Sequence, residues 1–290
     1  PRARGPGGRR GGIRSPARGG AHLVSMGALE AVTALLALSM RQFGYLSTAR
    51  QDPAGYTSGV IRGATASVSR AVREGEGQKL IEVEFVVSPH KNDVSLGETL
   101  DATRQIGAQL ARGLASRDPD ASWLVYPDNE EAKLAARAVG KVPSRILSLK
   151  QASEADPEKW PELILVHSTG YNIDEFFQVE KLIDRSAADG GSIVAVNCNI
   201  DRLRSGYYPS LLYPRLAKSS RRCFDKFDPV FYASNKLIGG GWLVRSYPDE
   251  WCVVVDIGGA QQVVLSSATR PAPSDAERAI RSAFAAAQAQ

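Results

Sequence analysis

The sequence predicts an α/β protein, a Rossmann-like three-layer sandwich around a mixed sheet, with an extra apolar helix near the N-terminus. Strand-like and helix-like segments alternate between residues 60 and 197, which is typical of right-handed crossovers and a largely parallel sheet. After about residue 220, strand-like segments follow one another through tight turns. This second pattern predicts an antiparallel meander that continues the sheet.

The first 20 residues are mainly Arg, Gly, Pro, Ala and Ser, with no acidic residue and one large apolar residue, Ile13. A segment of this composition cannot bury enough apolar surface to fold alone. An Arg-rich start without acidic residues is also typical of transit peptides. We therefore expect residues 1–20 to be disordered and transit-like.

Residues 21–40 form an apolar run of Ala, Leu, Val and Met without Pro. A helix of this length spans roughly 30 Å, the thickness of a bilayer core. Three interpretations remain open: a membrane-embedded helix with Glu30 turned toward a protein or pigment partner, an amphipathic helix docked on a partner, or the apolar core of a targeting signal. We predict an apolar helix over residues 21–43 that docks on a membrane or on a partner. Its expected docking residues are Leu23, Met26, Gly27, Glu30, Ala31, Leu35 and Leu38.

Residues 44–56 carry Asp-Pro and Gly-Tyr-Thr-Ser elements and are predicted to be a linker, so the α/β domain is expected over residues 57–290. Its helices are predicted from apolar residues at helical spacing, such as Ile106 and Leu110, and from caps such as Asp128. The predicted helices span residues 60–73, 97–115, 130–139, 173–183 and 275–287.

The strands are predicted from short runs of β-branched and aromatic residues. Residues 80–87 alternate early, which puts Glu82 and Glu84 on one face of the first strand. The predicted strands span residues 80–87, 123–126, 145–149, 162–167, 192–197, 221–227, 230–237, 242–245, 251–255 and 262–265. Residues 151–160 are expected to form a polar loop. The strands 242–245 and 251–255 flank a turn at Pro248 and Asp249 and form the most distinctive element, a hairpin.

Charge is distributed unevenly along the chain. Residues 1–50 hold eight Arg and one acidic residue, a net charge of +7, so the rest of a chain of net charge +5 carries −2. A nucleic-acid-binding body is disfavoured, because phosphate binding needs a clustered basic face. The three Cys are far apart and odd in number, which favours buried thiols in a reducing compartment over a disulfide framework.

Familiar enzyme motifs are absent from the sequence. No phosphate-binding loop, dinucleotide fingerprint or nucleophile elbow occurs, and Gly239-Gly240-Gly241 lies between two predicted strands, where a turn is expected. The three His have no partners at metal-ligand spacing, so no metal site is predicted.

Polar residues follow several predicted strands, at the edge where open α/β sheets bind ligands. The predicted ligand rim consists of Asp128, His167, Ser168 and Asn197. Asn199 is expected at the same edge. The alternative interpretation is structural, with Asp128 capping a helix and Ser168 lying in a turn.

Several segments in this order resemble one family. They are residues 81–85, Tyr126-Pro127-Asp128, residues 131–135, residues 194–197, residues 224–232, residues 241–251 and Arg270-Pro271. Together they resemble the plastid and cyanobacterial domain-of-unknown-function family found in low-photosystem-II-accumulation proteins and fused to a chloroplast adenylate kinase. The resemblance covers about residues 57–287. It carries over no catalytic residue.

The resemblance implies a plastid protein beside a photosystem. We expect a non-enzymatic accessory protein at the thylakoid, with the α/β domain as a binding platform and photosystem or light-harvesting proteins as partners. The apolar segment would attach it there, with a chlorophyll contact near Glu30 as the one cofactor contact considered. The alternative is a soluble enzyme that binds a nucleotide or another small molecule at the strand-end rim.

Overall fold

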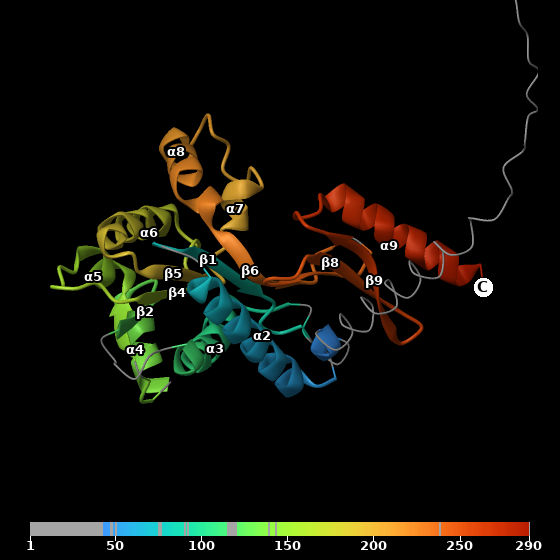
Figure 1. Cartoon of the computed structure of the whole chain (residues 1–290), viewed down its shortest axis with the longest axis horizontal. Coiled ribbons are helices and arrows are strands. Elements are labelled where there is room, and N and C mark those ends of the chain that lie inside the picture. Colours follow the sequence, from blue (N-terminus) through green and yellow to red (C-terminus); the bar gives the residue numbers. More distant parts are fainter. Residues whose placement is uncertain are drawn as a thin grey trace, which may run out of the picture. The chain divides into compact units, whose positions relative to one another are not determined.

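The computed structural model describes residues 43–46, 49, 51–74, 77–89, 91, 93–114, 121–138, 140–142, 144–237 and 239–289. Its strands form one nine-stranded sheet in the order β3-β2-β4-β5-β1-β6-β7-β8-β9 (Figure 1). The strands are β1 (Leu80–Phe85), β2 (Ser122–Tyr126), β3 (Arg145–Ser148), β4 (Leu163–His167), β5 (Ser192–Val196), β6 (Asp228–Ser234), β7 (Trp242–Ser246), β8 (Trp251–Ile257) and β9 (Ala260–Ser267). The helices are α2 (Pro53–Arg73), α3 (Leu96–Leu114), α4 (Asn129–Ala138), α5 (Leu149–Glu154), α6 (Ile173–Ser186), α7 (Asp201–Arg204), α8 (Pro214–Arg222) and α9 (Pro273–Gln288).

The sheet has a parallel part and an antiparallel part, as the sequence predicts. All neighbouring pairs from β3 to β6 are parallel, and β6 to β9 pair antiparallel. Strands β2, β4 and β5 are buried along their whole length, which is expected of parallel strands covered on both faces.

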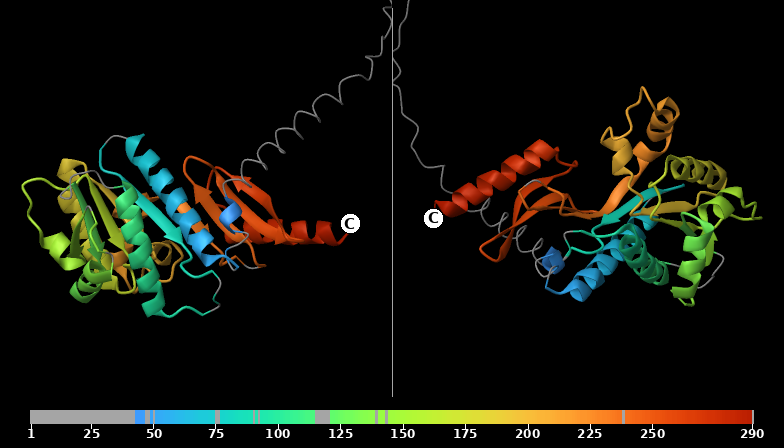
Figure 2. Two further views of the ribbon diagram at one scale, coloured as in Figure 1. Left: turned by 90° about the horizontal axis from the view of Figure 1, so that it is seen from below. Right: turned by 180° about the vertical axis from the view of Figure 1, so that it is seen from behind.

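Helices cover both faces of the parallel part and so make three layers (Figure 2). One apolar core joins the sheet to α2, α3 and α4, and a second joins the opposite face to α5, α6 and α8. A third, smaller core lies between α9 and the antiparallel strands. The expectation of a Rossmann-like three-layer sandwich with an antiparallel extension is therefore confirmed.

Residues 221–227 do not form the predicted strand. They are the end of α8 and a 3₁₀ turn, Phe224–Lys226, that leads into β6. Cys223, Phe224 and Phe227 are all buried in the second core, so this segment is as rich in buried apolar and aromatic side chains as a strand. The prediction was wrong because it followed the apolar and aromatic composition of the segment, although positions 223, 224 and 227 do not alternate as one face of a strand would.

Two other segments are more ordered than predicted. Part of the expected polar loop at 151–160 is α5, which starts with a capping box between Ser148 and Gln151. Helix α2 begins at Pro53, inside the predicted linker, where the Asp52 carboxylate accepts a hydrogen bond from the Gly55 amide at 2.8 Å. Leu46 and Ala49 of that segment are also buried, so it packs on the domain instead of acting as a spacer.

The transit-like segment 1–20 and the seven docking residues of the apolar segment lie outside the described residues. Among the helices that the structure describes, none combines the length and the apolar character needed to cross a bilayer.

Candidate functional site

The carboxyl ends of β1, β5 and β6 border a cleft. It consists of two adjoining hollows, of about 660 Å³ and 470 Å³. Both hollows are lined by Glu84, Asn199, Arg202, Ser234 and Lys236. A cleft of this size outside the carboxyl ends of parallel strands is where open α/β sheets bind small ligands.

The turns that follow β4 and β5 have unusual backbone geometry. Ser168, Asn197 and Asn199 adopt positive φ values of 51°, 51° and 52°. The left-handed region costs L-residues about 1–2 kcal/mol, so the surroundings must hold it in place. Asn197 Oδ1 accepts a hydrogen bond from the Phe85 amide at 2.9 Å, and Asn199 Nδ2 donates to the Thr169 carbonyl at 3.3 Å. These bonds fix the chain that leads into α7, which forms one wall of the cleft.

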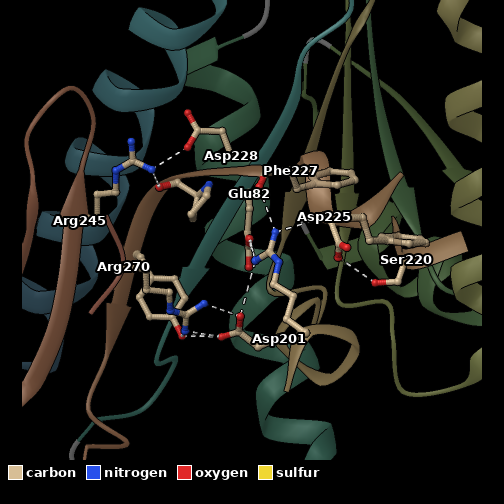
Figure 3. A network of polar contacts seen from close by, with 12 residues as sticks. Glu82, Asp201, Ser220, Asp225, Phe227, Asp228, Arg245 and Arg270 are labelled. Atoms are coloured by element: carbon tan, nitrogen blue, oxygen red, sulfur yellow. Dashed lines mark hydrogen bonds and ion pairs between the residues drawn. The ribbon is translucent and has the colours of Figure 1, made fainter. Parts of the chain in front are cut away.

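An Asp–Arg–Tyr cluster, Asp201, Arg270 and Tyr232, lines the larger hollow. Figure 3 shows Arg270 beside Asp201. Arg270 donates to both carboxylate oxygens of Asp201, at 2.6 and 2.8 Å, and the Tyr232 hydroxyl donates to the same carboxylate at 2.7 Å. The Arg270 guanidinium also lies 4.6 Å from the ring centre of Tyr232. Burial alone would raise the pKa of Asp201, but the bonds and charge of Arg270 outweigh it and lower that pKa. Asp201 and Arg270 thus largely neutralise each other.

A second ion pair lies beneath the cleft. Glu82 of β1 is only 2% exposed, and Arg204 of α7 donates to it at 2.5 Å. Arg204 also donates to the Phe224 and Phe227 carbonyls, at 3.2 and 3.0 Å. Burial raises the pKa of Glu82, while the positive charge of Arg204 opposes that rise. This pair ties α7 to the central strand.

Glu84 lies two residues further along β1, on the same face as Glu82, and pairs in register with Tyr232 of β6. Its half-buried carboxyl group makes no hydrogen bond or ion pair with any other described residue. Burial, with the nearby charge of Glu82, raises the pKa of Glu84 to about 8, although Lys236 opposes the rise. At pH 7 Glu84 is therefore mostly protonated and can donate a hydrogen bond into the cleft.

Two cations complete the cleft. The Lys236 ammonium makes no hydrogen bond or ion pair within the part of the chain that the structure describes. The Arg202 guanidinium lies 5.5 Å from the ring centre of Tyr171 and 5.6 Å from that of Tyr207, and donates to the Gly170 carbonyl at 3.2 Å. These contacts leave most Arg202 donors available at the edge of the cleft.

The predicted rim does not form one site. Asp128 is exposed and accepts a hydrogen bond from the Glu131 amide at 2.8 Å, so it caps α4. Ser168 is buried, and only Asn197 lines the cleft. His167 is fully buried and stacks on Tyr126 with ring centres 5.2 Å apart. Burial lowers the pKa of His167 to about 3, so it stays neutral.

The sequence interpretation missed Glu84, Tyr232 and Arg270 as site residues. The structure shows that Glu82 and Glu84 lie on a strand that is flanked by further strands on both sides. Both faces of such a strand are covered, so its acidic residues need counter-charges or an opening. The sequence does not show that β1 is central, however, because its neighbours come late in the chain.

Metal ligands do not converge in the described part of the chain: no group of three or more His, Cys, Asp or Glu side chains there is placed to hold an ion. Cys198, Cys223 and Cys252 are free thiols and all are buried. Burial raises the pKa of Cys198 to about 12, so this thiol is protonated.

Neither a curated protein nor a solved structure matches the chain. One family model does match, over residues 57–278, and its description is a domain of unknown function, DUF1995. This match covers most of the α/β domain, including the cleft residues from Glu84 to Arg270. The chain therefore belongs to the DUF1995 family.

Proposed function

We propose that the α/β domain binds a small organic anion, a carboxylate or a phosphate ester, in the cleft at the ends of β1, β5 and β6. The observation that carries this proposal is the convergence of Lys236, Arg202 and a protonated Glu84 on one cleft. All three have polar atoms that the fold itself leaves largely unused.

Charge supports an anion over a cation. Two ion pairs, Arg204 with Glu82 and Arg270 with Asp201, contribute little net charge. Lys236 and Arg202 then remain, and the protonated Glu84 neither cancels nor repels them at neutral pH. The cleft therefore has an excess of positive charge and one neutral hydrogen-bond donor, the combination that suits an anionic group.

The lining also supports an organic body on this ligand. The lining of the larger hollow includes the apolar residues Leu237, Leu243 and Pro271. Ligand pockets typically combine such apolar surface with a few placed polar groups. We therefore expect the anionic group near Lys236 and the apolar part against these three residues.

The test is thermal unfolding and calorimetric titration of the full chain with a panel of carboxylates, inorganic phosphate and nucleotides. A ligand at about 100 times its Kd stabilises the folded state by about 2.7 kcal/mol. Lys236→Ala is expected to weaken binding roughly 10- to 100-fold, because it removes a charge-assisted hydrogen bond. Lys150→Ala removes an exposed lysine of α5 and should leave binding unchanged. Equal affinity in the wild type and Lys236→Ala would place the ligand elsewhere, and no shift with any compound would remove the support for a ligand cleft.

We also propose a plastid location and an accessory role beside a thylakoid photosystem. The family resemblance and the Arg-rich, acid-free start support this proposal. It is tested by mild solubilisation of native membranes, a density gradient and detection of the protein across the fractions. Co-migration with one photosystem is the expected result, and recovery in the soluble fraction alone would overturn it.

A further inference from the structure

The segment between α7 and α8 exposes large apolar side chains. Leu211 is 90% exposed, Leu212 71%, Tyr207 65% and Tyr213 37%. The segment and α8 project outward from one face of the sheet in Figure 1 and, seen from behind, in Figure 2. Large apolar residues scattered singly on a surface need no explanation, but four of them within seven positions indicate an interaction site.

This apolar segment is held in shape by its own rings. Tyr208 packs edge-on against Tyr207, with ring centres 4.9 Å apart, and against Tyr213 at 5.4 Å. Tyr208 also meets Phe176 of the second core at 6.4 Å. The exposed side chains therefore sit on an ordered base, so presenting them to a partner costs little conformational entropy.

Basic residues flank the apolar segment, and acidic ones are missing. Residues 205–222 contain no Asp or Glu, and α8 carries four basic residues. These basic residues are Arg215, Lys218, Arg221 and Arg222. Arg222 pairs with Glu180 and Asp184, whereas Lys218 and Arg221 form no ion pair with another described residue. The exposed face of α8 is therefore a cationic surface directly after the apolar residues.

We propose that residues 207–213 insert into the surface of an anionic lipid bilayer while Lys218 and Arg221 contact its headgroups. Interfacial membrane segments combine Leu and aromatic side chains with Lys and Arg in this way, and tyrosines favour the headgroup level. A protein interface of standard size uses about 20–30 residues on each side, many more than this short segment offers. The proposal does not depend on what the cleft binds.

The test uses the full chain with vesicles of phosphatidylglycerol and phosphatidylcholine, and with vesicles of phosphatidylcholine alone. Leu211→Cys carries an environment-sensitive fluorophore, which labels only the added thiol because the three native thiols are buried. Glu158→Cys, at an exposed position before β4, is the labelled control. A local probe is needed so that vesicle binding through any other segment of the full chain, such as residues 21–43, is not counted.

The expected result is a blue shift of the Leu211→Cys label on anionic vesicles, with none at Glu158→Cys. In the Leu211→Cys background, Lys218→Ser with Arg221→Ser should weaken this response roughly 30-fold, since each basic residue near the surface contributes about a factor of five. Arg137→Ser with Lys150→Ser removes the same charge from α4 and α5 and should change it by less than about twofold. Leu212→Asp should abolish the shift without affecting the fold, because Leu212 is 71% exposed.

Three results would overturn the proposal. One is a label at position 211 that stays in a water-like environment on every vesicle, even if the chain binds through another segment. The second is an equal shift on neutral and anionic vesicles. The third is equal weakening by the two charge-matched double variants. The first of these would assign the apolar segment to a protein partner.

Discussion

The carboxyl edge of the sheet has two regions that look equivalent in topology and differ in use. In the first region, between the neighbours β2 and β4, the chain runs from β2 to β3 on one side and from β4 to β5 on the other. In the second region, between the neighbours β1 and β6, the chain runs from β1 to β2 on one side and from β6 to β7 on the other. Both are points where neighbouring strands send their connections apart, which is where α/β sheets form crevices. The cleft described above lies at the second region.

Side chains explain the difference. At β2 and β4 the rings of Tyr126 and His167 fill the crevice, and Gly107 of α3 lies directly over His167. At β1 and β6 the short helix α7 is tied by ion pairs to Glu82 and Arg270, and the space in front of Glu84 stays open. Topology thus determines where a site can form, and the packing of a few residues determines whether it does.

The largest effect should come from breaking the ion pair beneath the open region. Arg204→Met leaves Glu82, only 2% exposed, without its counter-charge. We expect a loss of about 3–5 kcal/mol in the free energy of unfolding, measured with urea. Adding Glu82→Gln should recover a large part of it, because no charge is then buried. A loss below about 1 kcal/mol would mean that Glu82 takes up a proton when Arg204 is absent, so that no charge is left buried.

The next effect probes the closed region. A Cβ at Gly107 would lie 2.5 Å from His167 Cε1, so Gly107→Ala must displace a buried ring. We expect a loss of about 2 kcal/mol, although Gly to Ala within a helix is otherwise favourable by about 1 kcal/mol. Gly97→Ala in the same helix meets no atom within 4 Å and should not destabilise. Adding His167→Ala should remove most of the stability loss caused by Gly107→Ala. If Gly107→Ala alone caused no loss of stability, the crevice would have room for a further methyl group.

The third prediction concerns the pH dependence of stability that Glu84 causes in the open region. Burial raises the pKa of Glu84 from 4.5 to about 8, so the folded state binds more protons than the unfolded state between these values. The stabilising contribution of the protonated group is complete below about pH 4.5 and is lost as the pH rises through 8. Glu84→Gln should gain about 2 kcal/mol over the wild type between pH 5 and pH 6.5 in urea unfolding, because the pKa of Glu84 in the folded protein lies well above this range.

Ligand binding should follow the same titration. Anion affinity of the wild type is expected to fall above about pH 8, where Glu84 becomes charged, and Glu84→Gln should flatten this dependence. Parallel pH profiles for the two proteins would exclude Glu84 from the site.

The smallest effect concerns Asp128, which the sequence placed at the rim. Asp128→Ala should cost about 1 kcal/mol, because it removes the cap of α4, and should leave ligand affinity unchanged. Asp128→Ser should restore most of the stability, since a hydroxyl also caps. If Asp128→Ala lowered the ligand affinity, Asp128 would contribute to binding, and the two regions would form one site.

Much of this architecture was predictable from the sequence, because it rests on local signals. The strands at 192–196 and 163–167 and the helix after Asn172 follow from apolar runs and caps. The site was not predictable in the same way. Glu84 and Arg270 are 186 positions apart, and their meeting depends on the pairing of β1 with β6. His167 was expected to be accessible because it ends a strand, and only the position of Gly107 shows that it is covered.

The place of β1 also bears on how the chain folds as it is made. Leu80 pairs with Ile193, 113 residues further along, so β1 leaves the ribosome long before either neighbour exists. Such distant pairing is slow, and an unpaired apolar strand invites association with other chains. Until its partner strands are synthesised, Glu82 and Glu84 place negative charges within this apolar strand. We therefore expect the two acidic residues to reduce association of the nascent chain with other chains, in addition to their roles in the folded protein.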